Sequence, residues 1–147
     1  MISSLLKLLQ ANTTQEKQNS EHDIRLAAVA LLVEVAKADH HLSELEENKL
    51  LHIVNNLYDL NETEQSALIA AAKNKSSEAT SLYEYTSVIN ENFSEHEKFQ
   101  LITQMWKMAF SDNQIDSYEE HLIRRVADLI YLPHVKFIEA KHIADTN

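Results

Sequence analysis

The chain has 147 residues, of which 44% are hydrophobic, a formal net charge of −10, one proline, no glycine and no cysteine. This length and apolar content fit one domain with its own core, and the acidic balance disfavours binding to nucleic acid or to an anionic membrane. Without cysteine the chain has no disulfides, thiolate metal sites or cysteine nucleophiles, and without glycine it has no glycine-rich phosphate loop.

The N-terminal residues 2–9 are apolar, but the run is too short to cross a membrane. It has no basic leader and no cleavage site, so it is not expected to be a signal peptide. We predict an N-terminal docking segment over residues 1–19 that packs on the domain as a turn or helix. A weak membrane foot is the alternative, because a short amphipathic turn binds lipid poorly.

Capping boxes mark the helix starts: Ser, Thr, Asp or Asn is followed three residues later by Glu or Gln. The chain contains the boxes Ser43…Glu46, Asn61…Glu64, Ser81…Glu84, Ser94…Glu97 and Asp116…Glu119. With the apolar periodicity, they predict helices over residues 2–10, 21–38, 44–58, 62–75, 82–92, 95–111, 117–131 and 134–144. The expected fold is therefore a compact all-α bundle of about seven or eight helices, since the near absence of glycine and proline does not suit a β-rich chain.

Two of these helices, 21–38 and 95–111, are apolar around most of their circumference, whereas their neighbours are apolar on one side only. Such a pattern is typical of helices surrounded by other helices. We predict that these two form a buried central pair, with Val33 and Trp106 in the core.

The two central helices and the helices that follow them align at an offset of 73 residues, which predicts an internal repeat of 24–58 and 97–131. The identical pairs are Ala36/Ala109, Asp39/Asp112, Glu46/Glu119 and Glu47/Glu120. The polar stretch 73–80 is predicted to connect the halves inside one domain that spans 20–147.

The repeated turn ends each central helix with an aspartate, Asp39 or Asp112, although the negative end of a helix dipole disfavours an acid. A bound cation would explain both aspartates, and so would a backbone hydrogen bond within the turn.

Glu46 and Glu119, at the start of the next helices, have two readings. Each stands where a capping-box glutamate belongs, so a structural role is sufficient. If the two turns meet, however, Asp39, Glu46, Asp112 and Glu119 could supply four carboxylates for calcium or magnesium, and a cation would relieve their repulsion.

The pair His40-His41 beside Asp39 suggests a second chemistry, a metal-dependent hydrolase that uses the acidic turns and these histidines. The other histidines lack the spacing of zinc ligands, and exposed surface histidines are the simpler reading.

Three segments in order, 26–39, 82–94 and 105–128, resemble the TerB-like tellurite-resistance family, and the resemblance extends over 20–143. It implies a compact pseudo-symmetric helical bundle linked to tellurite and related stress resistance. It also implies cation binding at acidic turn positions that match Asp39, Glu46, Asp112 and Glu119. The family commonly has glycine after each turn aspartate. This chain has His40 and Asn113, of which asparagine tolerates the left-handed conformation better.

From the resemblance we predict a non-enzymatic interaction or scaffold module in the cytoplasm, linked to a divalent cation and to protein partners in a membrane-peripheral complex. The chain lacks an evident reductant for tellurite, because it has no cysteine and no recognisable cofactor motif. Nucleic acid is not expected as a partner, and the oligomeric state stays open.

Overall fold

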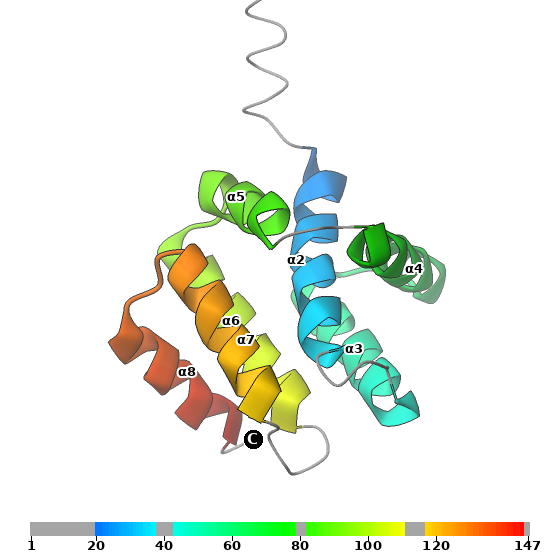
Figure 1. The fold of residues 1–147 in the computed structure, drawn as a ribbon. Coiled ribbons are helices and arrows are strands. Elements are labelled where there is room, and N and C mark those ends of the chain that lie inside the picture. The colour runs from blue at the N-terminus through cyan, green and yellow to red at the C-terminus, as the bar shows by residue number, and fades with distance from the viewer. Residues whose placement is uncertain (1–19, 38–42, 79–81, 111–116, 146–147) are drawn as a thin grey trace, which may run out of the picture.

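The structure is a computed structural model that describes residues 20–37, 43–78, 82–110 and 117–145. These residues form seven helices and no strand, which confirms the all-α prediction (Figure 1). In chain order the helices are α2 (Glu21–Ala36), α3 (Glu44–Leu57), α4 (Glu62–Glu78), α5 (Tyr83–Asn92), α6 (Glu95–Ala109), α7 (Ser117–Leu129) and α8 (His134–Asp145). The helix predicted over 2–10 lies outside the described residues.

Helices α2 and α6 form the centre of the bundle. Helix α2 contacts α3, α4, α5, α6 and α7, and α6 contacts α2, α3, α7 and α8 (Figure 1). Val33 of α2 and Trp106 of α6 are both 0% exposed. The prediction of two buried central helices is confirmed. A helix that is apolar on all sides stabilises the fold most where every face is buried against other helices.

Local capping sets where the helices begin. The reciprocal box is present at Ser43–Glu46 and at Ser94–Glu97. Asn61 and Glu64 form the same pair of bonds at α4, with Glu64 N donating to Asn61 Oδ1 over 2.8 Å. The boxes predicted at Ser81 and Asp116 begin outside the described residues. Each of the three observed boxes satisfies N–H groups that have no partner inside the helix.

Helix α4 is longer than predicted, and the prediction that 73–80 is a connection is wrong over its first residues. The helix continues to Glu78. Polar side chains of this stretch bond to other helices: Lys73 pairs with Glu47, and Ser76 bonds to Glu34. The Tyr85 hydroxyl also donates to the Lys75 carbonyl over 2.8 Å. The stretch reads as a loop because its residues are polar, but their partners lie on α2, α3 and α5.

The packing of the two halves follows one scheme. Helix α4 packs on α2 as α8 packs on α6, and α3 contacts α6 while α7 contacts α2. The contact of α3 with α4, in contrast, has no counterpart of similar extent between α7 and α8. The 73-residue offset and the domain boundaries at 1–19 and 20–147 stay predictions.

Candidate functional site

The four predicted carboxylate ligands divide into two that the structure describes and two that it does not. Asp39 and Asp112 lie outside the described residues, as do His40 and His41. Glu46 and Glu119 occupy the first turns of α3 and α7, and they are only 8% and 6% exposed. Two buried glutamates at matching places therefore do follow the two turns, as the repeat requires.

Glu46 caps its own helix. Its Oε1 accepts hydrogen bonds from Ser43 N over 3.2 Å and from Ser43 Oγ over 3.0 Å. In return, Glu46 N donates to Ser43 Oγ over 3.1 Å. The capping role predicted for Glu46 is thus observed, and it holds the start of α3 in place.

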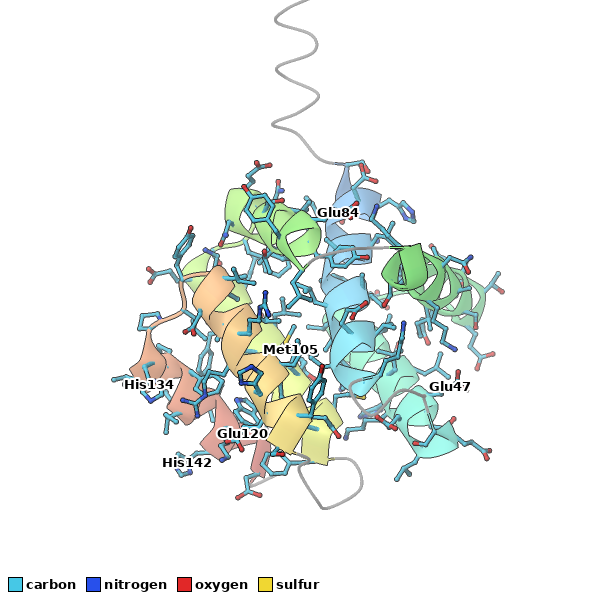
Figure 2. The ribbon with its side chains drawn as sticks, viewed as in Figure 1. Glu47, Glu84, Met105, Glu120, His134 and His142 are labelled. Atoms are coloured by element: carbon cyan, nitrogen blue, oxygen red, sulfur yellow. The ribbon has the colours of Figure 1, made fainter. Side chains whose placement is uncertain are left out.

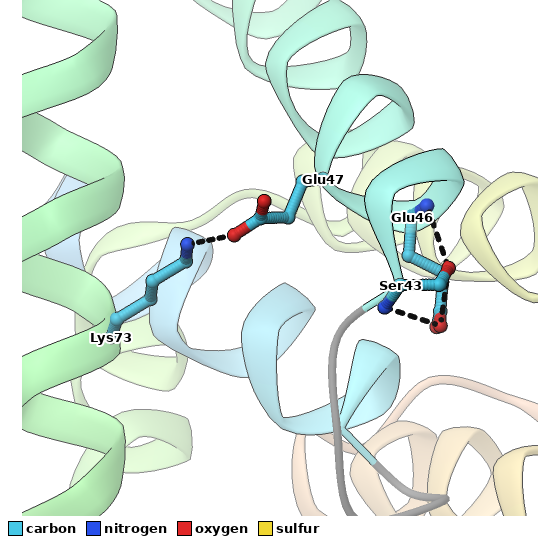
Figure 3. Close-up of polar contacts among 4 residues, drawn as sticks. All are labelled: Ser43, Glu46, Glu47 and Lys73. Carbon is cyan, nitrogen blue, oxygen red and sulfur yellow. Dashed lines mark hydrogen bonds and ion pairs between the residues drawn. The ribbon is translucent and has the colours of Figure 1, made fainter.

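The second glutamate of each repeated pair has a different task, which is to join two helices. Figure 3 shows Glu47 pointing toward Lys73 of α4, while the neighbouring Glu46 turns back to Ser43. In the other half, Lys141 of α8 pairs with Glu120 over 3.3 Å. One glutamate of the first pair therefore caps α3, and the second glutamate of both pairs reaches the next helix of its half.

Sequence reasoning missed Lys73 and Lys141. They lie 26 and 21 residues from their glutamates, so no local spacing rule identifies them. Both ion pairs are partly exposed, with side-chain exposures of 37% and 46% for Lys73 and Glu47. They join α3 to α4 and α7 to α8, and ion pairs this exposed contribute modestly to stability.

The described residues do not gather into a metal centre. No group of three or more histidine, aspartate or glutamate side chains suited to a metal ion occurs within the described ranges. Figure 2 places Glu47, on α3, well apart from Glu120, on α7. The cation site stays a prediction, because its two aspartates lie outside those ranges.

A groove of about 650 Å³ lies between α3, α6 and the end of α8. Its polar lining consists of Asn48, Lys49, His52, Asn56, Gln104, Lys107 and Asp145, and its apolar lining of Leu45, Ile53, Phe110 and Ala144. This volume is in the range of small-ligand pockets. The sequence did not reveal the groove, because three helices distant in the chain contribute to it.

Comparison with family models identifies the family of the chain. The family model described as "Tellurite resistance protein TerB" matches residues 25–142, which is most of the chain. No curated protein and no solved structure matches the sequence. Among the described helices, none combines the length and the hydropathy needed to cross a bilayer.

Proposed function

Because this chain belongs to the TerB family of tellurite resistance proteins, we propose that it is a non-enzymatic interaction module of a tellurite or related stress-resistance system. It would act in the cytoplasm with protein partners, in a complex at the membrane periphery. The observation that carries the proposal is the use of the repeated glutamate pairs. Glu46 caps α3, and Glu47 and Glu120 bind lysines of neighbouring helices.

A hydrolase would need a different arrangement of these groups. Metal-assisted hydrolysis requires ligands that converge on one open coordination position beside a substrate cleft. Here Glu46 turns back to the N-cap of its own helix while Glu47 points to α4 (Figure 3). Lysine, amide and apolar side chains predominate in the groove. These features favour recognition over catalysis.

We further propose that a divalent cation binds at the acidic turns, through Asp39 and Glu46 in one half and Asp112 and Glu119 in the other. Capping does not prevent this role for Glu46. Both hydrogen bonds from Ser43 go to Oε1, so among the described residues no donor occupies Oε2, and this oxygen can serve as a cation ligand. Calcium and magnesium prefer such oxygen ligands, and the net charge of −10 favours cations generally.

Thermal melting with millimolar calcium or magnesium, and again after chelation, tests the cation. At about 100 times the dissociation constant, binding should stabilise the wild type by roughly 2.7 kcal/mol. Asp112→Asn keeps the turn-forming side chain but removes a charged ligand, so its gain should be reduced or lost.

Glu46→Gln is the matched control for capping. Glutamine also serves at the third position of a capping box, so the variant should fold and melt near the wild type without metal. A reduced metal response in this variant would assign the loss to the cation. Melting curves of the wild type that do not respond to either metal would contradict the cation proposal and leave both glutamates as structural residues.

Capture experiments test the interaction role. The full chain, immobilised with and without calcium, should retain a defined set of proteins from a lysate of its native cell, and Asp112→Asn should lose the calcium-dependent members. Hydrolysis of a phosphate or peptide substrate that required metal and disappeared in Asp112→Asn would contradict the non-enzymatic role.

A further inference from the structure

The groove between α3, α6 and the end of α8 is lined by two lysines and one aspartate, although the chain as a whole is acidic. Lys49 projects from α3 and Lys107 from α6, so each of two walls carries one ammonium group. Asn48, Asn56 and Gln104 line it as well, and their amides can donate hydrogen bonds to an anion.

The two groove lysines also differ from most other described lysines in having no counter-ion. Lys73, Lys75, Lys136 and Lys141 each form an ion pair with a glutamate. Over the described ranges no carboxylate lies within ion-pairing distance of Lys49 or Lys107, although Asp145 lines the same groove. Among the described residues no carboxylate competes for their ammonium groups, which can therefore donate charge-assisted hydrogen bonds to a ligand.

The first half of the molecule shows how the same corner is filled internally. Under the predicted offset of 73, Glu34 is the partner of Lys107, and its carboxylate accepts a hydrogen bond from Ser76 of α4. Lys37 completes this cluster by donating to Ser76 Oγ over 3.2 Å.

The second half lacks such a cluster. Lys107 replaces the glutamate there, Phe110 stands at the place of Lys37, and Ala144 faces the groove from α8. Gln104 lies one turn before Lys107, and within the described part of the chain its buried Oε1 has no hydrogen-bond partner. Under the predicted offset, the corner that Glu34, Ser76 and Lys37 fill in the first half holds no such cluster here, and Lys107 has no counter-ion among the described residues.

We propose that this groove binds a small dicarboxylate. Two ammonium groups on different walls match two carboxylates, and the amides of Asn48 and Asn56 can bond to the remaining carboxylate oxygens. Ile53 and Phe110 supply apolar surface for the methylene groups between the carboxylates. This site is separate from the acidic turns, so it goes beyond the proposed function and does not depend on cation binding.

An NMR titration of the full chain with succinate at low ionic strength tests the proposal. Backbone amides along the groove faces of α3, α6 and α8 should shift saturably. Lys49→Met and Lys107→Met should each weaken binding by about tenfold or more. The free energy of a hydrogen bond to a charged group corresponds to at least a tenfold change in the dissociation constant. Lys98→Met is the matched control, because it removes a lysine of α6 that does not line the groove. It should leave the dissociation constant within about twofold.

Two further ligands test which chemical class of ligand the groove binds. Succinamide has the same length without charge and should not bind, and this comparison uses only the wild type, so it holds even if a variant fails to fold. Inorganic phosphate should bind more weakly than succinate. Equal affinity for phosphate would show that charge alone is recognised and would overturn the dicarboxylate assignment. Shifts that do not saturate, or a loss in Lys98→Met equal to that in Lys107→Met, would overturn the site.

Discussion

The two halves of the bundle, α2–α4 and α6–α8, each join two helices by a Glu–Lys ion pair, but the residues of their cores differ. Glu47 binds Lys73 in the first half, and Glu120 binds Lys141 in the second. The buried residues of α2 are alanine, valine and leucine only, whereas α6 buries Trp106 and two methionines. Matching connections therefore hold cores of different composition, because an ion pair between partly exposed side chains does not depend on the residues packed beneath it.

The aromatic centre of the second half draws in further side chains. Phe137 of α8 lies with its ring centroid 5.2 Å from that of Trp106, and the Lys141 ammonium is 5.2 Å from the Trp106 ring centroid. Lys141 thus makes two interactions, one with Glu120 and one with Trp106. Two lysines that each join a pair of helices can therefore contribute unequally to stability.

The ends of α3 and α7 differ as well. After α3, the half-buried Tyr58 is extended and lies under Arg25, and burial raises its pKa to about 12, while Arg25 opposes the shift. After α7, Tyr131 has φ 60° and is 80% exposed. Leu132 N bonds to Ala127 O and Tyr131 N to Asp128 O, which is the hydrogen-bond pattern that normally has glycine at this position.

The largest expected effect on stability comes from the buried residues of the two central helices. Trp106→Ala should destabilise the protein by about 3–5 kcal/mol, because it removes a fully buried aromatic ring. Val33→Ala, at the matching place in α2, should cost only about 2 kcal/mol. Urea denaturation measures both. Equal losses in the free energy of unfolding would mean that Trp106 stabilises the protein no more than Val33 does.

The second effect concerns the helix ends. Tyr131→Gly should stabilise the protein by about 0.5–1 kcal/mol, since it relieves a left-handed tyrosine but increases the entropy of the unfolded chain. Tyr58→Gly is the control and should destabilise, because Tyr58 is half-buried and not left-handed. Denaturation midpoints distinguish the two. A lower stability for Tyr131→Gly would show that the exposed ring makes contacts worth more than the backbone strain.

The smallest effect compares the two lysines. Double-mutant cycles with Glu47→Gln and Glu120→Gln should give coupling energies of about 0.2–1 kcal/mol for each ion pair, lower at high salt. Lys141→Met should cost about 0.5–1 kcal/mol more than Lys73→Met, because it also removes the contact with Trp106. Equal losses of stability in the two lysine variants would show that the contact of Lys141 with Trp106 adds nothing to stability.

The sequence alone determined the helices and the two buried ones among them. Caps such as Ser43–Glu46 and Ser94–Glu97 act over three residues, and apolar periodicity reports directly which helices are covered on all sides. The same local reasoning ended α4 too early, because the residues that extend it, 76–78, are polar, and Ser76 bonds to Glu34 of α2.

The partners of the other charged residues depend on the tertiary structure. The sequence predicted that Glu46 caps α3, but it did not indicate that the neighbouring Glu47 bonds to Lys73 of α4 (Figure 3). The fold also placed Lys49 and Lys107 on two walls of one groove. The two kinds of interaction act over different distances along the chain. Capping and periodicity act within a few residues, whereas ion pairs and grooves depend on how helices distant in the chain pack against each other.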